Sequence, residues 1–227
     1  MIRHHPENNL LLEYAAGSLP WALSLVVAAH VQLCPQCRSQ YQTMNRVGGS
    51  LLQDVEPQPL PADALQRLMG RIASAEQGAE QEAITAKAAA TKNADPLFAR
   101  LPRVIRKLVD GNEPLKWKRV SPALRMSRLH TGQERYEVAF HRIHSGGKVA
   151  EHDHRGREIT LVLYGSFSDK DGVYGEGDFL VREPGEIHRP IATQDQECLC
   201  FSVVEAPVTI TGPLGWLINP FLSFRPG

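Results

Sequence analysis

A histidine and two cysteines near the N-terminal end have the spacing of a metal site. They lie in the run His30-Val-Gln-Leu-Cys34-Pro-Gln-Cys37, so that the histidine precedes the first cysteine by one helical turn. Imidazole nitrogen and thiolate sulfur are the ligands that zinc prefers, usually four of them in a tetrahedron with bond lengths of about 2.0–2.3 Å. Two buried cysteines beside a histidine are the alternative interpretation. The histidine at this spacing favours zinc.

The fourth ligand of such a site has two candidates, His4 and His5, in the run Arg3-His4-His5-Pro6. We favour His5, because Pro6 restricts its backbone to extended conformations and so fixes its direction. A frayed terminus is the alternative. A site that includes His5 would tie the start of the first helix to the turn between the next two, and metal binding would supply much of the folding free energy.

Three more histidines and a glutamate form a second candidate metal site. His152 and His154 are two residues apart, so that in a strand their side chains point to the same side. Glu158 follows after a short loop, and His188 follows a later turn. Such a ligand set binds a first-row divalent metal and leaves room for other ligands. Zinc, manganese, iron and nickel all tolerate it, so the sequence does not identify the metal.

The residues around the first site predict a bundle of four helices, at 6–16, 21–33, 35–47 and 61–76. Glycines are natural residues after a helix, and we expect Gly17 to end the first helix and Gly48 the third. The second helix is apolar nearly all round, which predicts that other helices or a partner protein surround it. The fourth has apolar residues on one side and charges on the other.

The second half of the chain has short alternating segments between Gly, Pro and Asp turns, which is typical of a sandwich or barrel. A small, polar, alanine-rich run precedes it and predicts a semi-flexible linker. We therefore expect a helical domain over 1–78, a linker over 79–97 and a β domain over 98–227. The fold class is α+β, with a zinc-bound four-helix bundle followed by an antiparallel β-barrel.

The composition gives the protein no net charge. The 227 residues include 25 basic and 25 acidic side chains, so no net field favours nucleic acid or a membrane surface. No run reaches the roughly 18 apolar residues of a membrane helix, and no signal peptide is recognisable, so we expect a cytoplasmic protein. The remaining cysteines, Cys198 and Cys200, alternate in a strand pattern. We interpret them as small buried hydrophobic residues, with an oxidant-sensitive thiol pair as the alternative.

The second site lies in a pattern that resembles the cupin motifs. The first motif is matched in its spacing by Gly146, His152, His154, Glu158 and Gly165. The run from Gly177 through Gly185 to His188 resembles the second motif. In the second motif Glu183 and Ala192 stand where proline and asparagine are usual, which concerns the shape of the turn more than the ligand.

The histidine–cysteine motif near the N-terminal end, followed by a linker and then by the cupin motifs, resembles the ChrR-type zinc-binding anti-sigma factors over nearly the whole chain. The resemblance implies that the helical domain binds zinc and sequesters an extracytoplasmic-function sigma factor. The implied zinc ligands are His5, His30, Cys34 and Cys37. The implied cupin ligands, for a second divalent metal with zinc favoured, are His152, His154, Glu158 and His188. The resemblance further implies that the sigma factor is released in response to oxidative stress of the singlet oxygen or organic peroxide type.

The surface that docks on the sigma factor is expected to be apolar, with Trp21, Leu25 and Val26 as candidates. The protein would then be a regulator and not an enzyme, with no direct contact to nucleic acid. A metal-dependent cupin enzyme, a dioxygenase or isomerase with a zinc-bound helical appendage, is the alternative. Against it, the sequence offers no clear substrate-orienting residues. His141 and His144 are expected to be ordinary strand residues.

Overall fold

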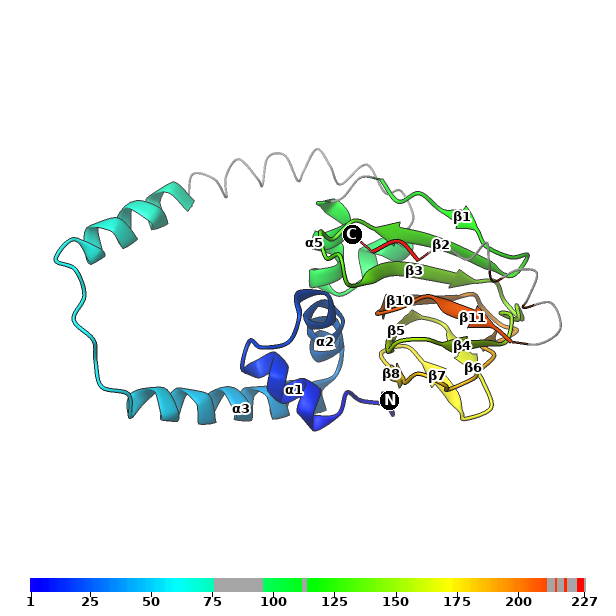
Figure 1. Ribbon diagram of the computed structural model, residues 1–227, viewed down its shortest axis with the longest axis horizontal. Coiled ribbons are helices and arrows are strands. Elements are labelled where there is room, and N and C mark those ends of the chain that lie inside the picture. The colour runs from blue at the N-terminus through cyan, green and yellow to red at the C-terminus, as the bar shows by residue number, and fades with distance from the viewer. Residues whose placement is uncertain (76–95, 112–113, 212–214, 216–218, 220–223, 227) are drawn as a thin grey trace.

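The structure, a computed structural model, describes residues 1–75, 96–111, 114–211, 215, 219 and 224–226. A helical N-terminal part lies against a β-rich second part (Figure 1). The helices are α1 (Asn8–Ala15), α2 (Trp21–Leu33), α3 (Pro35–Gln53), the short 3-10 helix η1 (Pro96–Arg100) and α5 (Arg103–Asp110), and residues 64–75 are also helical. The expected linker, 79–97, lies outside the described residues except for its last two, which begin η1.

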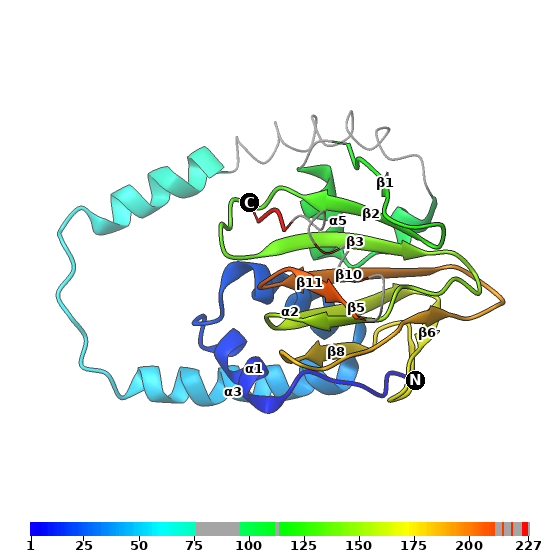
Figure 2. The same ribbon diagram turned by 45° about the vertical axis from the view of Figure 1, so that its right-hand side comes forward.

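The strands of the second part form three antiparallel sheets (Figure 2). The strands are β1 (Lys118–Arg119), β2 (Leu124–Leu129), β3 (Glu137–Ile143), β4 (His152–His154), β5 (Glu158–Tyr164), β6 (Ser166–Ser168), β7 (Val173–Gly175), β8 (Phe179–Arg182), β9 (Ile191–Ala192), β10 (Cys198–Val204) and β11 (Val208–Ile210). Six form a sheet in the order β1-β2-β3-β10-β5-β8, β11 pairs with β4, and the third sheet has the order β7-β6-β9. The antiparallel prediction is confirmed, although the described strands do not close into one barrel.

Helix α2 lies at the centre of the molecule. It contacts α1, α3, α5, β5 and β10, and most of its side chains are buried. Buried residues of the helices and of the large sheet form one continuous core, which explains why α2 is apolar nearly all round. Among the described residues, no helix is both long enough and apolar enough to cross a membrane.

Helix α3 is longer than the sequence led us to expect. Gly17 has a φ of +70°, the left-handed geometry that suits a residue after α1, whereas Gly48 and Gly49 keep helical backbone. A glycine inside a helix costs about 1 kcal/mol relative to alanine, which a helix of this length tolerates. The prediction that α3 ends near residue 47 was therefore wrong.

The expected four-helix bundle is not formed. Helices α1, α2 and α3 pack together, but residues 64–75 lie away from them (Figures 1 and 2). The apolar side chains of this segment remain in solvent, with Leu65 67% and Leu68 51% exposed. The amphipathic pattern correctly predicted a helix, but such a pattern does not say what covers its apolar side.

Candidate metal centres

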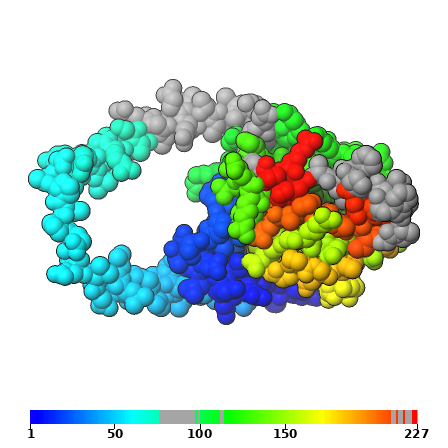
Figure 3. All heavy atoms as spheres, viewed as in Figure 1, coloured from blue at the N-terminus to red at the C-terminus, as the bar shows by residue number. Residues whose placement is uncertain are grey.

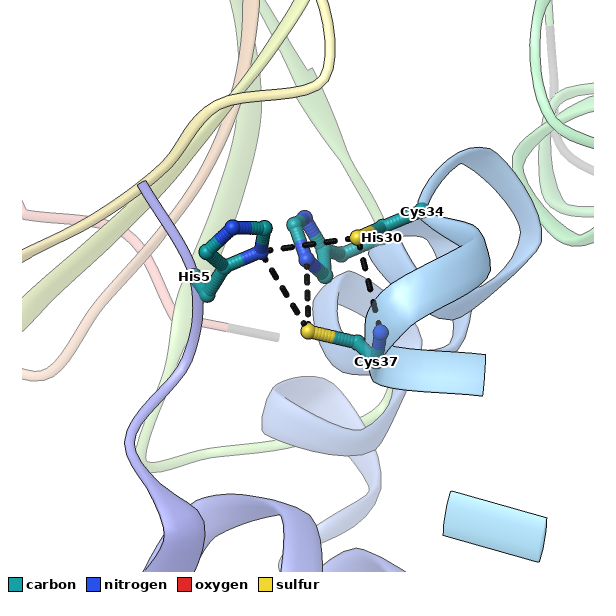
Figure 4. Close-up of side chains that lie close together, drawn as sticks. All are labelled: His5, His30, Cys34 and Cys37. Atoms are coloured by element: carbon teal, nitrogen blue, oxygen red, sulfur yellow. Dashed lines mark hydrogen bonds between the residues drawn. The ribbon is translucent and has the colours of Figure 1, made fainter. Parts of the chain in front are cut away.

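The first cluster lies where the N-terminal arm meets the turn between α2 and α3 (Figure 4). It contains His5, His30, Cys34 and Cys37, and one ligand atom from each lies within 4.8 Å of the others. His30 is in the last turn of α2, and Cys34 caps the start of α3, its Sγ accepting a hydrogen bond from the Cys37 amide at 3.5 Å. The helix–turn–helix geometry thus converts the spacing of the sequence motif into a convergent set.

The distances within this cluster fit a zinc ion. His30 Nε2 lies 3.3 Å from Cys37 Sγ, and His5 Nδ1 lies 3.4 Å from the Sγ atoms of both Cys34 and Cys37. A tetrahedron of nitrogen and sulfur ligands at zinc bond lengths has edges of roughly 3.3–3.8 Å. The donor atoms therefore already have the separations that a shared zinc ion requires.

Burial also prepares these side chains to bind a cation. It lowers the pKa of His30 to about 4, which keeps the imidazole neutral and able to act as a ligand. Burial, together with the neighbouring Cys34, raises the pKa of Cys37 to about 12. Without a metal the Cys37 thiol therefore stays protonated at neutral pH, and a bound cation supplies the charge that stabilises its thiolate.

The two N-terminal histidines lie in different surroundings. His5 faces the cysteines, whereas His4 Nδ1 lies 3.4 Å from Asp178 Oδ2 and the His4 ring packs on Tyr174 at a centroid distance of 4.7 Å. The favoured candidate, His5, is the one that lies in the cluster.

The second cluster lies inside the β-rich part. His152 and His154 come from β4, Glu158 begins β5, and His188 lies between β8 and β9. One ligand atom from each lies within 4.8 Å of the others, and all but His152 are buried. The expectation that His152 and His154 point to the same side is met.

Hydrogen bonds around this cluster fix which nitrogens face its centre. His152 Nδ1 donates to the Ala150 carbonyl at 2.8 Å, and His188 Nδ1 donates to Asp169 Oδ2 at 3.2 Å. The Nε2 atoms of His152 and His188 are therefore left with lone pairs, and they are only 3.0 Å apart. His188 Nε2 also lies 3.1 Å from His154 Nε2. Lone pairs this close repel each other, and a metal ion between them removes the repulsion. Burial, the largest effect, lowers the pKa of His188 to about 4 and keeps it neutral.

Glu158 is held by a line of polar side chains across the sheet. Thr160 Oγ1 donates to Glu158 Oε1 at 3.1 Å and lies 2.9 Å from Ser202 Oγ, which in turn lies 3.2 Å from His141 Nδ1. Burial alone would raise the pKa of Glu158, but the surrounding histidines, His154 first, hold this pKa below its usual range. The carboxylate is thus ionised and oriented. His141, interpreted above as an ordinary strand residue, belongs to this line.

Several residues around the clusters carry no recognisable signal in the sequence. Asp169 joins His188 to Arg182, whose guanidinium donates to Asp169 Oδ2 at 2.6 Å and to the Tyr174 hydroxyl at 3.2 Å. The Gly177 carbonyl accepts a hydrogen bond from His30 Nδ1 at 2.9 Å. Gly177 belongs to the second cupin-like motif only as a turn glycine, so its contact with His30 could not be predicted.

Cys198 and Cys200 lie outside both clusters. Both are buried on β10 with their Sγ atoms 3.6 Å apart. The hydrogen bond with Cys198, followed by burial, raises the pKa of Cys200. These surroundings agree with the interpretation as small buried hydrophobic residues.

Comparison with known proteins assigns the chain to a family. Residues 107–207 match the ChrR Cupin-like domain. The anti-sigma-E factor ChrR of Cereibacter sphaeroides is 34% identical over 221 residues, which are 97% of this chain and 98% of that protein. The crystal structure of Rhodobacter sphaeroides SigE in complex with the anti-sigma ChrR superposes with a TM-score of 0.72 at 31% identity, covering 90% of this chain and 99% of that one. The chain therefore belongs to the ChrR family of anti-sigma factors.

Proposed function

We propose that this protein is an anti-sigma factor that binds an extracytoplasmic-function sigma factor through its helical part and releases it under oxidative stress. The family supports the first half of this proposal, since a relative of 31% identity forms a complex with the sigma factor SigE. That family consists of regulatory proteins, so the cupin enzyme alternative is set aside.

The observation that carries the proposal is an apolar surface with no cover among the described residues. It consists of the second half of α3, the segment after it and residues 64–75, and its largest exposed side chains are Val47, Leu51, Leu52, Val55, Leu60, Leu65, Leu68, Met69 and Ile72. In the space-filling view α3 and residues 64–75 project from the body with open space between them (Figure 3). Large apolar side chains left exposed in such number on neighbouring segments of the chain indicate a protein interface.

A groove between α1 and α3 extends this surface toward the body. It has a volume of about 630 Å³ and is lined by Asn8, Asn9, Leu12, Ser39, Gln40, Thr43 and Met44. Leu12, which is 57% exposed, gives it an apolar centre that suits a helix of the partner. Of the candidates named from the sequence, Leu25 and Val26 are buried in the core and are not available to a partner, while Trp21 remains about half exposed.

Zinc at His5, His30, Cys34 and Cys37 would stabilise this surface by fixing α3 to α2 and to the arm before α1. When the sigma factor binds, residues 64–75 would pack on it and complete the four-helix arrangement expected from the sequence. The cupin part, expected to have a barrel form, would hold a second divalent metal at His152, His154, Glu158 and His188 and would sense the oxidant. The boundaries 1–78 and 98–227 suit this division.

The docking surface is tested by charge substitutions. The full chain is used to capture proteins from the source bacterium, the sigma factor is identified by mass spectrometry, and its Kd is measured by calorimetry. Leu65→Asp/Leu68→Asp should weaken binding by roughly 100-fold or more, because charges replace two exposed leucines that the sigma factor would bury. Gln66→Asp, about 100° away from Leu65 around the helix, is the matched control and should leave the Kd unchanged. Equal affinity of all three proteins would contradict the docking surface.

The sensing role is tested separately. The complex is exposed to singlet oxygen or an organic peroxide, and the release of the sigma factor is followed. His152→Ala/His154→Ala should abolish release while leaving binding intact. Undiminished release from this variant would shift the trigger away from the cupin metal and toward the thiolates of Cys34 and Cys37.

A further inference from the structure

The N-terminal arm that carries His5 runs beside the β-rich part. The Phe179 amide, at the start of β8, donates a hydrogen bond to the His4 carbonyl at 3.1 Å. Strand β8 is the last strand of the six-stranded sheet, so this contact uses a free backbone group of an edge strand. The arm is thus attached to the cupin part just before it reaches the zinc cluster.

Asp178, in the turn between β7 and β8, makes the strongest contacts to the arm. Its Oδ1 accepts hydrogen bonds from the amides of Arg3 at 2.7 Å and His4 at 3.0 Å, and its Oδ2 accepts one from the Gly175 amide at 2.8 Å. Asp178 is only 4% exposed. A buried carboxylate with several backbone donors makes charge-assisted hydrogen bonds, which are about twice as strong as neutral ones.

The same turn contacts the second histidine of the zinc cluster. The Gly177 carbonyl accepts the 2.9 Å hydrogen bond from His30 Nδ1, so that Nε2 is left free to face Cys37. Gly177 has a φ of +89°, and a Cβ added there would lie 2.5 Å from Cδ1 of Ile2. The positive φ favours glycine at this position, and the absence of a Cβ leaves room for the Ile2 side chain of the arm. The β7–β8 turn therefore contacts the ring of His30 directly, and it contacts the arm at the residues just before His5.

We propose that the β7–β8 turn of the cupin part is the outer shell of the zinc centre, with Gly177 orienting His30 and Asp178 holding the arm that presents His5. Asp178 is a positioning residue, since it touches the arm and not the ion. The inference rests on the zinc ligands of the proposed function. It adds that the helical part does not hold the metal at full affinity by itself, because two of its four ligands are oriented from the other part of the chain.

The test measures metal binding at this cluster alone. Cobalt(II) bound by thiolates has an intense charge-transfer band in the near ultraviolet, which a cluster of histidines and a glutamate lacks, so the band reports only the first cluster. In the full chain, Asp178→Ala should weaken metal binding at this cluster by about 10–100-fold in a chelator competition, the range typical of lost outer-shell contacts. Metal affinity of the cupin cluster should stay unchanged in the same sample.

A second variant covers the case in which Asp178→Ala disturbs the turn itself. Deletion of residues 2–4 keeps His5 and every cupin residue but removes the partners of Asp178 in the arm, the amides of Arg3 and His4, and it should weaken the same cluster to a similar degree. Asp195→Ala, an exposed aspartate in another turn, is the matched control and should bind metal like the wild type.

Hydrogen exchange of the metal-free chain gives a readout that does not depend on the ion. The amides of Arg3 and His4 should exchange slowly in the wild type and rapidly in Asp178→Ala. Wild-type metal affinity in both variants, together with slow exchange of the Arg3 and His4 amides in Asp178→Ala, would overturn the inference. A wild type that never develops the thiolate band would instead overturn the zinc assignment of the proposed function, and the exchange data would then show whether the arm is held at all.

Discussion

The two metal clusters differ in where their supporting contacts come from. Around the cupin cluster every described supporting residue, from Ala150 and Thr160 to Asp169, belongs to the cupin part itself. Around the helical cluster the ring of His30 and the arm of His5 are held by Gly177 and Asp178, across the boundary between the two parts. The first cluster is therefore a joint between the parts, and the second is internal to one of them.

The ligand types differ in the same direction. Two thiolates and two imidazoles make a closed tetrahedral site of the structural kind. Three imidazoles and one carboxylate leave coordination positions for an exogenous ligand. These two kinds of site suit the proposed function, in which the first cluster would stabilise the fold and the cupin cluster would respond to the oxidant.

Among the variants, the largest effect is expected from removing the thiolates of the first cluster. Cys34→Ser/Cys37→Ser should lose the metal of the first cluster and, with it, about 4 kcal/mol of unfolding free energy when free zinc stands at 1,000 times the wild-type Kd. Zinc content by mass spectrometry and denaturant unfolding measure both changes. Cys198→Ser/Cys200→Ser removes the same number of buried thiols and should keep the zinc. Equal zinc loss in the two variants would contradict the assignment.

Acid should destabilise the metal-free protein through both clusters. His30 and His188 each have a folded-state pKa of about 4, because burial disfavours the imidazolium, against about 6.5 when unfolded. Between these values the unfolded chain binds more protons, so stability is complete above about pH 6.5 and falls as the pH drops toward 4. The loss is on the order of 3 kcal/mol per histidine. Unfolding curves of chelator-treated protein check it, and a flat profile between pH 7 and pH 4 would refute it.

A smaller effect, confined to the cupin cluster, is expected from Glu158→Gln. The substitution keeps the size of the side chain but removes the charge of a direct ligand, and should weaken metal binding there by at least about 100-fold, the upper limit typical of residues that only support the ligands. Chelator competition measures it, with the thiolate band of cobalt(II) at the first cluster as an internal control. A simultaneous loss of that band would show that the cupin cluster is not independent of the joint.

The smallest effect is expected from the side chain that orients Glu158. Thr160→Val removes the hydrogen bond to Glu158 Oε1 and should weaken cupin metal binding by about 10-fold, whereas Thr160→Ser keeps the hydroxyl and should restore it. The same competition assay applies. If the serine variant binds metal as weakly as the valine variant, the hydrogen bond from the hydroxyl does not by itself account for the effect.

Local spacing was enough to predict which side chains lie together in each cluster. His30, Cys34 and Cys37 lie within two helical turns, and His152, His154 and Glu158 lie within one strand, a loop and the start of the next, so backbone periodicity alone brings them together. The antiparallel strands and helices α1 and α2 followed from similar patterns. The length of α3 did not, because glycine weakens a helix without forbidding it.

Contacts over long sequence distances could not be predicted in this way. Asp178 resembles any aspartate in a turn until the fold brings residues 3 and 4 to its carboxylate. The position of residues 64–75 was also out of reach, because an amphipathic helix specifies an apolar side and not its partner. In both cases the outcome depends on whether a tertiary contact forms, and the local sequence does not determine this.

The attachment of the arm to Asp178 also sets an order of events during synthesis. Domains generally fold as units while the ribosome proceeds from the N-terminal end, so the helices emerge long before residue 178 has been made. Until then the contacts of Asp178 with the arm and of Gly177 with His30 cannot form. If zinc binds at the first cluster as proposed, it would be held fully only after translation has passed the β7–β8 turn, and a truncated chain that ends before this turn should exchange it faster than the finished protein.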